Sequence, residues 1–227
     1  AWGDATKMMA PGFRLCERMA ETDMQYYLCA TGLFNSIEIL AHDSKYGLTE
    51  LLKDPFALCN KEPLKHREAC YSNMLPVHFE EFGGDFDKIL AYINNKMIDK
   101  NEPAVDGKNI NQQVVIGTMF EFIRLHNRDT DYVKAGIDVC RRQPSDDYEP
   151  CVEGLSGGHL KYGAPGIEYE QNLAFCNDPY LTEIEQNACY RYFLTHLDIN
   201  YNPEKVENIC RMAEPMYREK YCSTRHL

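Results

Sequence analysis

Apolar residues recur along this chain with the spacing of amphipathic helices. The clearest case is Ile116, Met119, Phe120 and Ile123, which occupy positions i, i+3, i+4 and i+7 and therefore share one helical face. A shorter apolar stretch at 89–93 has the character of the end of a preceding helix. Residues 80–127 are therefore predicted to form two helices joined by a polar connection.

Four other stretches with helical apolar spacing end at a cysteine, and a proline follows each within five residues. The cysteines are Cys59, Cys140, Cys176 and Cys210, and the prolines are Pro63, Pro144, Pro179 and Pro215. Because proline cannot continue a helix, it marks a helix end and a turn. A second cysteine comes after the turn, and in three cases further helix-forming sequence follows it. The pattern predicts a series of helical hairpins.

The ten cysteines form five close pairs whose members are 11 to 13 residues apart. Zinc sites favour ligands two to four residues apart, and the chain contains neither a CxxC nor a CxxCH motif. An even count at regular spacing is typical of disulfides formed in an oxidising compartment. A disulfide near a hairpin turn suits the Cα separation of about 5–6 Å that the bond requires. We expect strictly sequential pairing: Cys16–Cys29, Cys59–Cys70, Cys140–Cys151, Cys176–Cys189 and Cys210–Cys222.

The first cysteines of successive pairs are 43, 81, 36 and 34 residues apart. The long interval spans two units, one of which, within 80–127, lacks cysteines. A period in this range is typical of helical solenoids. We therefore predict one all-α repeat domain over 1–227, a short α-solenoid of about six antiparallel hairpins, five of them clasped by local disulfides. The expected hairpins are 5–42, 46–79, 80–127, 130–161, 166–198 and 202–227.

One segment resembles a known family. The sequence LKYGAPG at 160–166, followed by YEQNLA at 169–174, is similar to a Sel1-like repeat, a relative of the tetratricopeptide repeat. The resemblance covers one repeat. It implies a helical-repeat protein, and disulfide-clasped versions occur among secreted bacterial Sel1-like proteins.

Composition narrows the class of protein. Hydrophobic residues are 44% and charged residues 26%, an ordinary globular balance, and no apolar run approaches the roughly 18 residues that span a membrane. A net charge of −11 disfavours nucleic acid as a partner. The chain contains no Asn-x-Ser/Thr sequon, which favours a periplasmic or bacterial-surface location. A first residue of Ala1 is expected of a mature chain whose signal peptide has been removed, although an expression boundary would look the same.

The first candidate binding segment is the long connection at 99–108. It lacks apolar periodicity and lies in the hairpin without cysteines, and insertions in repeat arrays often lie on a binding face. The alternative is a tolerated loop without a role. The segment is not an EF-hand, because it lacks the alternating acidic ligands and the distal glutamate of that motif. The candidate side chains are Asp99, Asn101, Glu102, Asp106 and Lys108.

The second candidate segment is an expected loop at 154–159, with Ser156, His159 and the nearby Tyr162 as binding candidates. The letters match GxSxG, but a nucleophile elbow needs a buried strand before the serine, and residues 146–153 are too polar for one. Its three glycines suit close helix packing or a flexible turn equally well. We assign no catalytic residue.

The histidines suggest a possible metal or haem site, and the tyrosines suggest a binding groove. His78, His159, His196 and His226 recur after the second cysteine of their units, but equivalent positions on neighbouring helices lie about 8–10 Å apart, too far to share one ion. We predict structural roles for them. The Tyr26-Tyr27 pair fits a binding groove and a helical core equally well.

The sequence favours a secreted or periplasmic binding or scaffold protein, without cofactor or metal, that engages a protein or peptide partner through its concave face and irregular loops. It could serve as an accessory subunit of a larger extracytoplasmic complex. One alternative is an enzyme or a metal- or haem-associated redox protein whose site is assembled from distant residues. Another is a structural surface-layer component.

Overall fold

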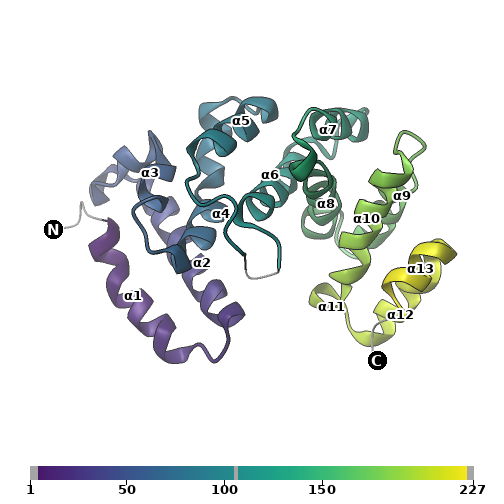
Figure 1. Cartoon of the computed structure of the whole chain (residues 1–227), viewed down its shortest axis with the longest axis horizontal. Coiled ribbons are helices and arrows are strands. Elements are labelled where there is room, and N and C mark those ends of the chain that lie inside the picture. Colours follow the sequence, from purple (N-terminus) through teal and green to yellow (C-terminus); the bar gives the residue numbers. More distant parts are fainter. Residues whose placement is uncertain (1–4, 105–106, 224–227) are drawn as a thin grey trace. The chain divides into compact units, whose positions relative to one another are not determined.

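Helices make up the regular structure of the chain. A computed structural model describes residues 5–104 and 107–223, and within these ranges it contains helices α1 to α13, two short 3₁₀ helices and one isolated bridge, with no strand (Figure 1). The all-α prediction is confirmed. The chain divides into two compact units, Ala1–Val114 and Val115–Leu227, which we call the N-terminal unit and the C-terminal unit.

Side-chain caps define where helices of the N-terminal unit begin. The Thr22 side chain accepts a hydrogen bond from the backbone N–H of Gln25 at 3.2 Å, and Asp54 accepts one from Ala57 at 3.2 Å. These oxygens satisfy amide groups that the first helical turn leaves without a backbone partner. The helices of this unit are α1 (Ala5–Met19), α2 (Asp23–Ala41), the 3₁₀ helices η1 (Ser44–Tyr46) and η2 (Thr49–Leu52), α3 (Pro55–Cys59), α4 (Leu64–Glu81), α5 (Phe86–Lys96) and the start of α6 (Ile110–His126).

The core of the N-terminal unit lies where α2 packs along α4 and α1 packs along α2. Phe34 and Ile37 of α2 are buried, as are Tyr71 and Leu75 of α4. Phe56 of α3 packs edge-on against Tyr71, with ring centroids 4.8 Å apart. The long helices α2 and α4 therefore form the centre of the core of this unit.

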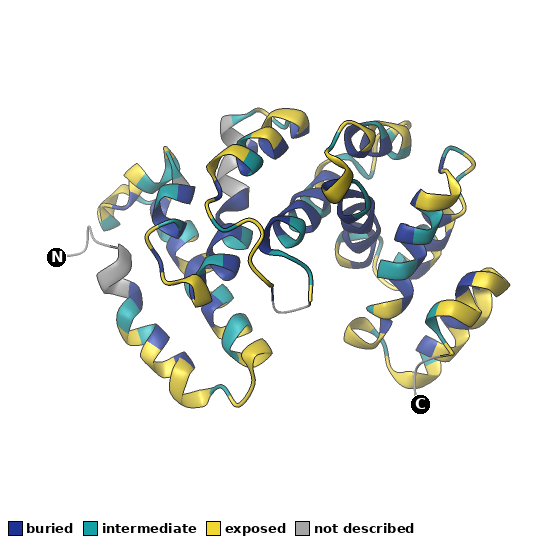
Figure 2. Cartoon of the chain, viewed as in Figure 1, coloured by how far each residue is buried: buried dark blue, intermediate teal, exposed yellow. Residues whose placement is uncertain are grey.

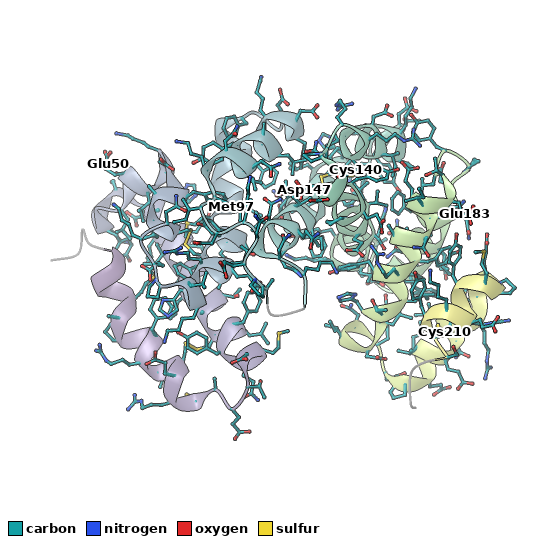
Figure 3. The ribbon with its side chains drawn as sticks, viewed as in Figure 1. Glu50, Met97, Cys140, Asp147, Glu183 and Cys210 are labelled. Carbon is teal, nitrogen blue, oxygen red and sulfur yellow. A yellow bond between two sulfur atoms is a disulfide. The ribbon has the colours of Figure 1, made fainter. Side chains whose placement is uncertain are left out.

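All ten cysteines are paired, and the pairing is sequential as the spacing predicts. The Cα–Cα separations range from 5.4 to 6.2 Å. Each bond joins one helix to the next helix or to its C-cap, as Cys140 of α7 (Tyr132–Arg141) is joined to Cys151 of α8 (Ser145–Tyr162) (Figure 3). The helices α5 and α6 follow one another without a disulfide. The prediction of five local disulfides is confirmed.

Helix α8 is the most buried element of the C-terminal unit, and every residue from 150 to 160 is buried (Figure 2). It packs against α9 and α10. Its glycines make a close approach to α6 possible: a Cβ at Gly154 would lie 2.5 Å from the backbone oxygen of Ile116, and one at Gly158 would lie 2.7 Å from the Cβ of Ile123. The other helices are α9 (Glu168–Cys176), α10 (Glu183–Thr195), α11 (Leu197–Asn200), α12 (Pro203–Met212) and α13 (Pro215–Tyr221).

One buried carboxylate links three helices of the C-terminal unit. Arg141 of α7 donates to both oxygens of Glu185 in α10, with Nε–Oε1 at 2.8 Å and a terminal nitrogen to Oε2 at 2.9 Å. The hydroxyl of Tyr148 in α8 donates to Oε1 at 2.7 Å, and the backbone N–H of Thr182 donates to Oε2 at 2.7 Å. Burial alone would raise the pKa of Glu185, but the hydrogen bonds from Arg141 and Thr182 outweigh it and lower the pKa to about 2. These contacts hold the ends of α7, α8 and α10 together.

Across the described residues, no helix combines the length and the apolar character needed to cross a membrane.

Candidate functional site

A pocket of about 340 Å³ opens in the N-terminal unit beside the first turns of α2 and α4. Its walls come from three segments that are far apart in the sequence: the start of α2, the start of α4 and the connection that precedes α6. Among the residues that the structure describes, they combine two tyrosines, aliphatic side chains, two carboxylates and one lysine. The lining residues are Asp23, Tyr26, Tyr27, Leu64, Lys65, Glu68, Pro103, Ala104 and Ile110.

Hydrogen bonds give the connection before α6 a defined shape. Pro103 and Asn109 form an isolated antiparallel bridge, and the N–H of Ala104 donates to the carbonyl of Lys108 at 2.7 Å. Gly107 has a φ of 85°, a left-handed conformation that glycine adopts without a Cβ clash. Asn109 then accepts from the N–H of Gln112 at 2.8 Å, where α6 begins. The connection thus holds Pro103 and Ala104 against the pocket.

The polar residues of this connection that the sequence predicted as binding candidates do not belong to the described lining of the pocket. Asp99 forms an ion pair with Arg67 of α4, and the carbonyl of Glu102 accepts from the N–H of Ile110 at 2.9 Å. Asn101 is exposed and Lys108 half-buried, while Asp106 lies outside the described residues. The described lining of the pocket contains Pro103 and Ala104 from this segment but not Asp99, Asn101, Glu102 or Lys108. The predicted loop reaches a pocket through its apolar residues, whereas Asp99 anchors it to α4.

A chain of hydrogen bonds runs from the pocket wall into the core. The hydroxyl of Tyr26 lies 2.6 Å from Nε2 of His66, and Nδ1 of His66 lies 3.2 Å from Oε2 of Glu62. His66 and Glu62 are 5% and 2% exposed, so water does not compete for these contacts. The His66 ring also stacks on Phe13, with centroids 3.8 Å apart. Tyr26 is therefore held in the wall of the pocket by His66 of α4, whose ring is positioned in turn by Phe13 of α1 and by Glu62.

The direction of the hydrogen bond between His66 and Glu62 follows from the chemistry of the carboxylate. A carboxylate oxygen accepts, so Nδ1 of His66 carries the proton. Nε2 of His66 and the hydroxyl of Tyr26 share a hydrogen bond of 2.6 Å. Burial raises the pKa of Tyr26, which keeps the hydroxyl protonated and able to donate.

The basic residue of the pocket lining is already paired. Lys65 forms an ion pair with Glu17 of α1 and lies over the Tyr26 ring, with Nζ 5.3 Å from the centroid. The hydrogen bond from Lys65 lowers the pKa of Glu17, and the same bond raises the pKa of Lys65. Both partners stay charged and neutralise one another at the rim. The described lining also contains the carboxylates of Asp23 and Glu68.

The second predicted segment is wrong as a loop, because residues 154–159 lie inside α8. Ser156 is fully buried, and its hydroxyl contacts Asn172 at 3.0 Å and the carbonyl of Cys189 at 3.1 Å. His159 is 2% exposed, and burial lowers its pKa to about 4. The three glycines allow close packing of α8 against its neighbours. Because Ser156 is buried, the residues that match GxSxG do not form an accessible nucleophile.

Tyr162 braces two helices of the C-terminal unit. Its hydroxyl donates to Oε1 of Glu121 in α6 at 2.6 Å, and its carbonyl accepts from Asn127 at 3.1 Å. Burial and the neighbouring Glu121 raise the pKa of Tyr162. This side chain holds the end of α8 against α6 within the C-terminal unit, whereas the predicted residues at 99–108 belong to the N-terminal unit.

The recurrent histidines pack rather than converge. His159 contacts Phe175 with ring centroids 5.2 Å apart, and His196 stacks on Tyr192 at 3.9 Å. His226 and the side chain of His78 lie outside the described residues. Among the side chains that the structure describes, no group of three or more His, Cys, Asp or Glu could hold a metal ion.

Sequence reasoning left open the role of Tyr26 and missed His66 and Glu62. The spacing of Glu62 and His66, four residues apart at the start of a helix, was visible in the sequence and is typical of side chains on one helical face. The contact of His66 with Tyr26 spans 40 residues and depends on how α2 packs along α4.

No family model, curated protein or solved structure matches this chain.

Proposed function

We propose that this protein is a secreted or periplasmic binding or scaffold protein that takes a segment of a protein or peptide partner into the pocket of its N-terminal unit. The observation that carries the proposal is the pocket itself. Apolar Leu64, Ala104 and Ile110 lie beside Tyr26 and Tyr27, with charged groups at the margin. Tyrosines and aliphatic residues within a polar rim are the composition of protein interfaces.

The rigidity of the walls supports this function. Tyr26 is held by His66, and the connection before α6 is tied to α4 by the ion pair of Asp99 with Arg67. The Cys16–Cys29 disulfide fixes α2 to α1. A site that is ordered before binding loses little conformational entropy when the partner arrives, which favours affinity. The five disulfides support an oxidising, extracytoplasmic location for such a protein.

The test is to select binding peptides from a random library on the purified, oxidised protein and to measure their affinities for two variants. Leu64 is 46% exposed at the first position of α4, so Leu64→Gln removes an apolar contact from the pocket without opening the core. Ile184, 56% exposed in the first turn of α10, supplies the matched control Ile184→Gln outside the pocket.

We expect Leu64→Gln to weaken the selected peptides about tenfold, because residues central to an interface contribute more than about 1 kcal/mol each. Ile184→Gln should leave their affinity within about twofold. Far-ultraviolet circular dichroism verifies that both variants fold. A selection that yields no peptide sensitive to Leu64→Gln would refute binding at this pocket.

A further inference from the structure

We propose that copies of this chain associate head to tail: the first hairpin, α1–α2, of one copy docks on a pocket of the last hairpin, α12–α13, of the next. The partner at these two surfaces is therefore a second copy of this chain. The inference does not depend on the pocket of the N-terminal unit. It rests on the apolar side chains of the first hairpin, the pocket of the last hairpin, the packing of successive hairpins and the charge of the two hairpins.

The first hairpin carries a large share of the exposed apolar side chains. Among the described residues, thirteen large hydrophobic side chains are exposed, and five of them belong to α1 and α2. Single exposed hydrophobic residues are ordinary on a protein surface, but a group of them on one hairpin marks an interaction surface. The five are between 44% and 70% exposed: Leu15, Met19, Met24, Leu28 and Ile39.

On α1, two of these side chains lie away from the helix that covers the hairpin. Phe13 and Glu17, four residues apart, contact α4 through a ring stack and an ion pair. Leu15 and Met19 are also four residues apart, and the helical period places them on a different face of α1. That face is not turned toward α4.

On α2, the exposed apolar positions lie opposite the core. Leu28 and Ile39 are eleven residues apart, which is three helical turns, and their shared face is opposite the buried Phe34. Leu15 and Leu28 each precede one cysteine of the Cys16–Cys29 disulfide, so they come from adjoining turns of the two helices. We call this surface the outer face of the first hairpin; it consists of Leu15, Met19, Leu28 and Ile39.

The last hairpin carries a pocket on the side that is turned away from α10. Tyr217 of α13 stacks on Tyr190 of α10, with ring centroids 4.3 Å apart, which fixes the face of α13 that contacts α10. Residues of another face of α13, with the spacing i, i+3, i+4 and i+7, line a pocket of about 500 Å³ together with α12. The described lining includes Val206, Cys210, Pro215, Arg218, Glu219 and Cys222.

The two surfaces are complementary in shape. Met19 and Leu28 are 70% and 60% exposed, so their side chains project from the first hairpin. The pocket of the last hairpin has room for such a side chain, and Val206, Cys210 and Pro215 give it apolar walls. Two outer faces would bring projecting side chains together, and two pockets would leave both pockets unfilled. A head-to-tail contact places an aliphatic side chain in the pocket.

This contact continues the packing that holds each unit together. Within the N-terminal unit α2 packs along α4, and within the C-terminal unit α10 packs against both α8 and α13. Helices of one hairpin are thus covered by helices of a neighbouring hairpin. No helix of the described chain covers the outer face of α1–α2 or the pocket of α12–α13. A second copy offers each of these surfaces a hairpin of the kind that packs beside it elsewhere in the chain.

The charge of the two hairpins also favours the contact. The chain has a net charge of −11, so copies of it repel one another in general. Residues 5–41 contain three basic and four acidic residues, and residues 203–221 contain four of each. The repulsion between two copies is therefore weakest where these nearly neutral hairpins meet.

The experiment measures the mass of the purified, oxidised protein by sedimentation velocity over a series of concentrations. Leu28→Lys places a charge on the outer face of α2. Glu219→Lys adds a third basic group to Arg211 and Arg218 in the lining of the pocket. Because burying an unpaired charge is costly, each variant blocks one of the two surfaces. The control is Ile98→Lys, at a side chain that is 58% exposed in the N-terminal unit and lies outside the outer face.

We expect the mass of the unmodified protein to rise with concentration, because a head-to-tail contact leaves a surface at each end for a further copy. In Leu28→Lys and in Glu219→Lys alone, association should weaken by about tenfold or more, whereas Ile98→Lys should associate like the unmodified protein. An equimolar mixture of Leu28→Lys and Glu219→Lys should form dimers and nothing larger, because each copy keeps one intact surface. Far-ultraviolet circular dichroism verifies that each variant folds.

Three results would overturn the proposal. The first is a monomer at every concentration of the unmodified protein, and the second is a mixture of the two folded variants that stays monomeric. The third is a dimer of either variant alone, since only an isologous contact survives when one of the two surfaces is blocked in every copy. Each of these results leaves peptide binding in the pocket of the N-terminal unit untouched, because the Leu64→Gln comparison tests that function separately.

Discussion

Replacing Glu185 by glutamine should destabilise the C-terminal unit markedly. The side chain is fully buried and accepts hydrogen bonds from Arg141, Tyr148 and Thr182. Glutamine keeps the shape but places an NH₂ donor among these donors and removes the charge that pairs with Arg141. The guanidinium then loses its bidentate partner and keeps the more distant Asp138, at 3.9 Å.

The size of the effect follows from the pKa. Arg141 and Thr182 lower the pKa of Glu185 from its ordinary 4.5 to about 2 despite burial. At about 1.4 kcal/mol per pKa unit, the folded state gains about 3 kcal/mol at neutral pH. Because the Arg141 side chain is 33% exposed, solvent screens part of this energy, and we expect a loss of about 2 kcal/mol in Glu185→Gln.

The sign of the pH dependence follows from the same shift. A carboxylate with a lowered pKa stabilises the fold above its unfolded pKa of 4.5, and the stabilisation disappears as the pH falls toward 2. The free energy of unfolding of the unmodified protein should therefore approach that of Glu185→Gln over this interval. Glutamine does not titrate, so the variant lacks this contribution at every pH.

The assay is urea unfolding, followed by far-ultraviolet circular dichroism with the disulfides intact, at neutral pH and at several values below 4.5. The control is Glu183→Gln, which changes an exposed neighbour in the same helical turn (Figure 3). We expect the control to alter the free energy of unfolding by less than about 0.5 kcal/mol. If Glu185→Gln is as stable as the control at neutral pH, or if the gap is constant with pH, the role assigned to this carboxylate is wrong.

Two further predictions concern packing and the disulfides. Gly154→Ala should lower the free energy of unfolding, measured in urea, by about 1–3 kcal/mol, because the new Cβ would lie 2.5 Å from the backbone oxygen of Ile116. The control Gly32→Ala, whose Cβ would have no atom within 4 Å, should raise it by about 0.5 kcal/mol. Equal effects of the two variants would contradict the close approach of α8 to α6. Brief treatment with a thiol reductant under native conditions, followed by alkylation and peptide mass spectrometry, should label the Cys16–Cys29 and Cys210–Cys222 pairs first. Each of these two terminal disulfides has one cysteine that is exposed or half-buried, Cys29 and Cys222, so the reductant can reach it. Early labelling of the three internal disulfides would refute this order.

Features that depend on short stretches of chain were predictable. The Cys59–Cys70 bond closes across one turn, and the proline after Cys59 marks that turn, so spacing alone indicated the pairing. The connection at 99–108 was recognisable as irregular, yet which of its side chains would face a pocket was not. Asp99 forms an ion pair with Arg67, and Ala104 lines the pocket. The backbone hydrogen bonds within the connection and the ion pair to α4 determine which of its side chains reach the pocket.

The segment at 154–159 illustrates where local reasoning fails. Three glycines in six residues favour a turn by propensity. In α8, however, these glycines lie where the helix passes close to Ile116 and Ile123 of α6, and a larger side chain would clash there. The same residues are therefore helical, and Ser156 and His159 are buried. Tertiary contact outweighs a local preference of about 1 kcal/mol per glycine.

The sequence by itself determined the all-α class, the helical hairpins and the order of the disulfides, since apolar spacing, prolines and cysteine intervals act within about 40 residues. Only the tertiary structure decided the candidate site. Tyr26, His66 and Ala104 come from separate segments, and their meeting depends on the packing of α2 along α4 and on the fold of the connection before α6. Contacts between distant segments depend on how whole helices pack together, and a local sequence pattern does not contain that information.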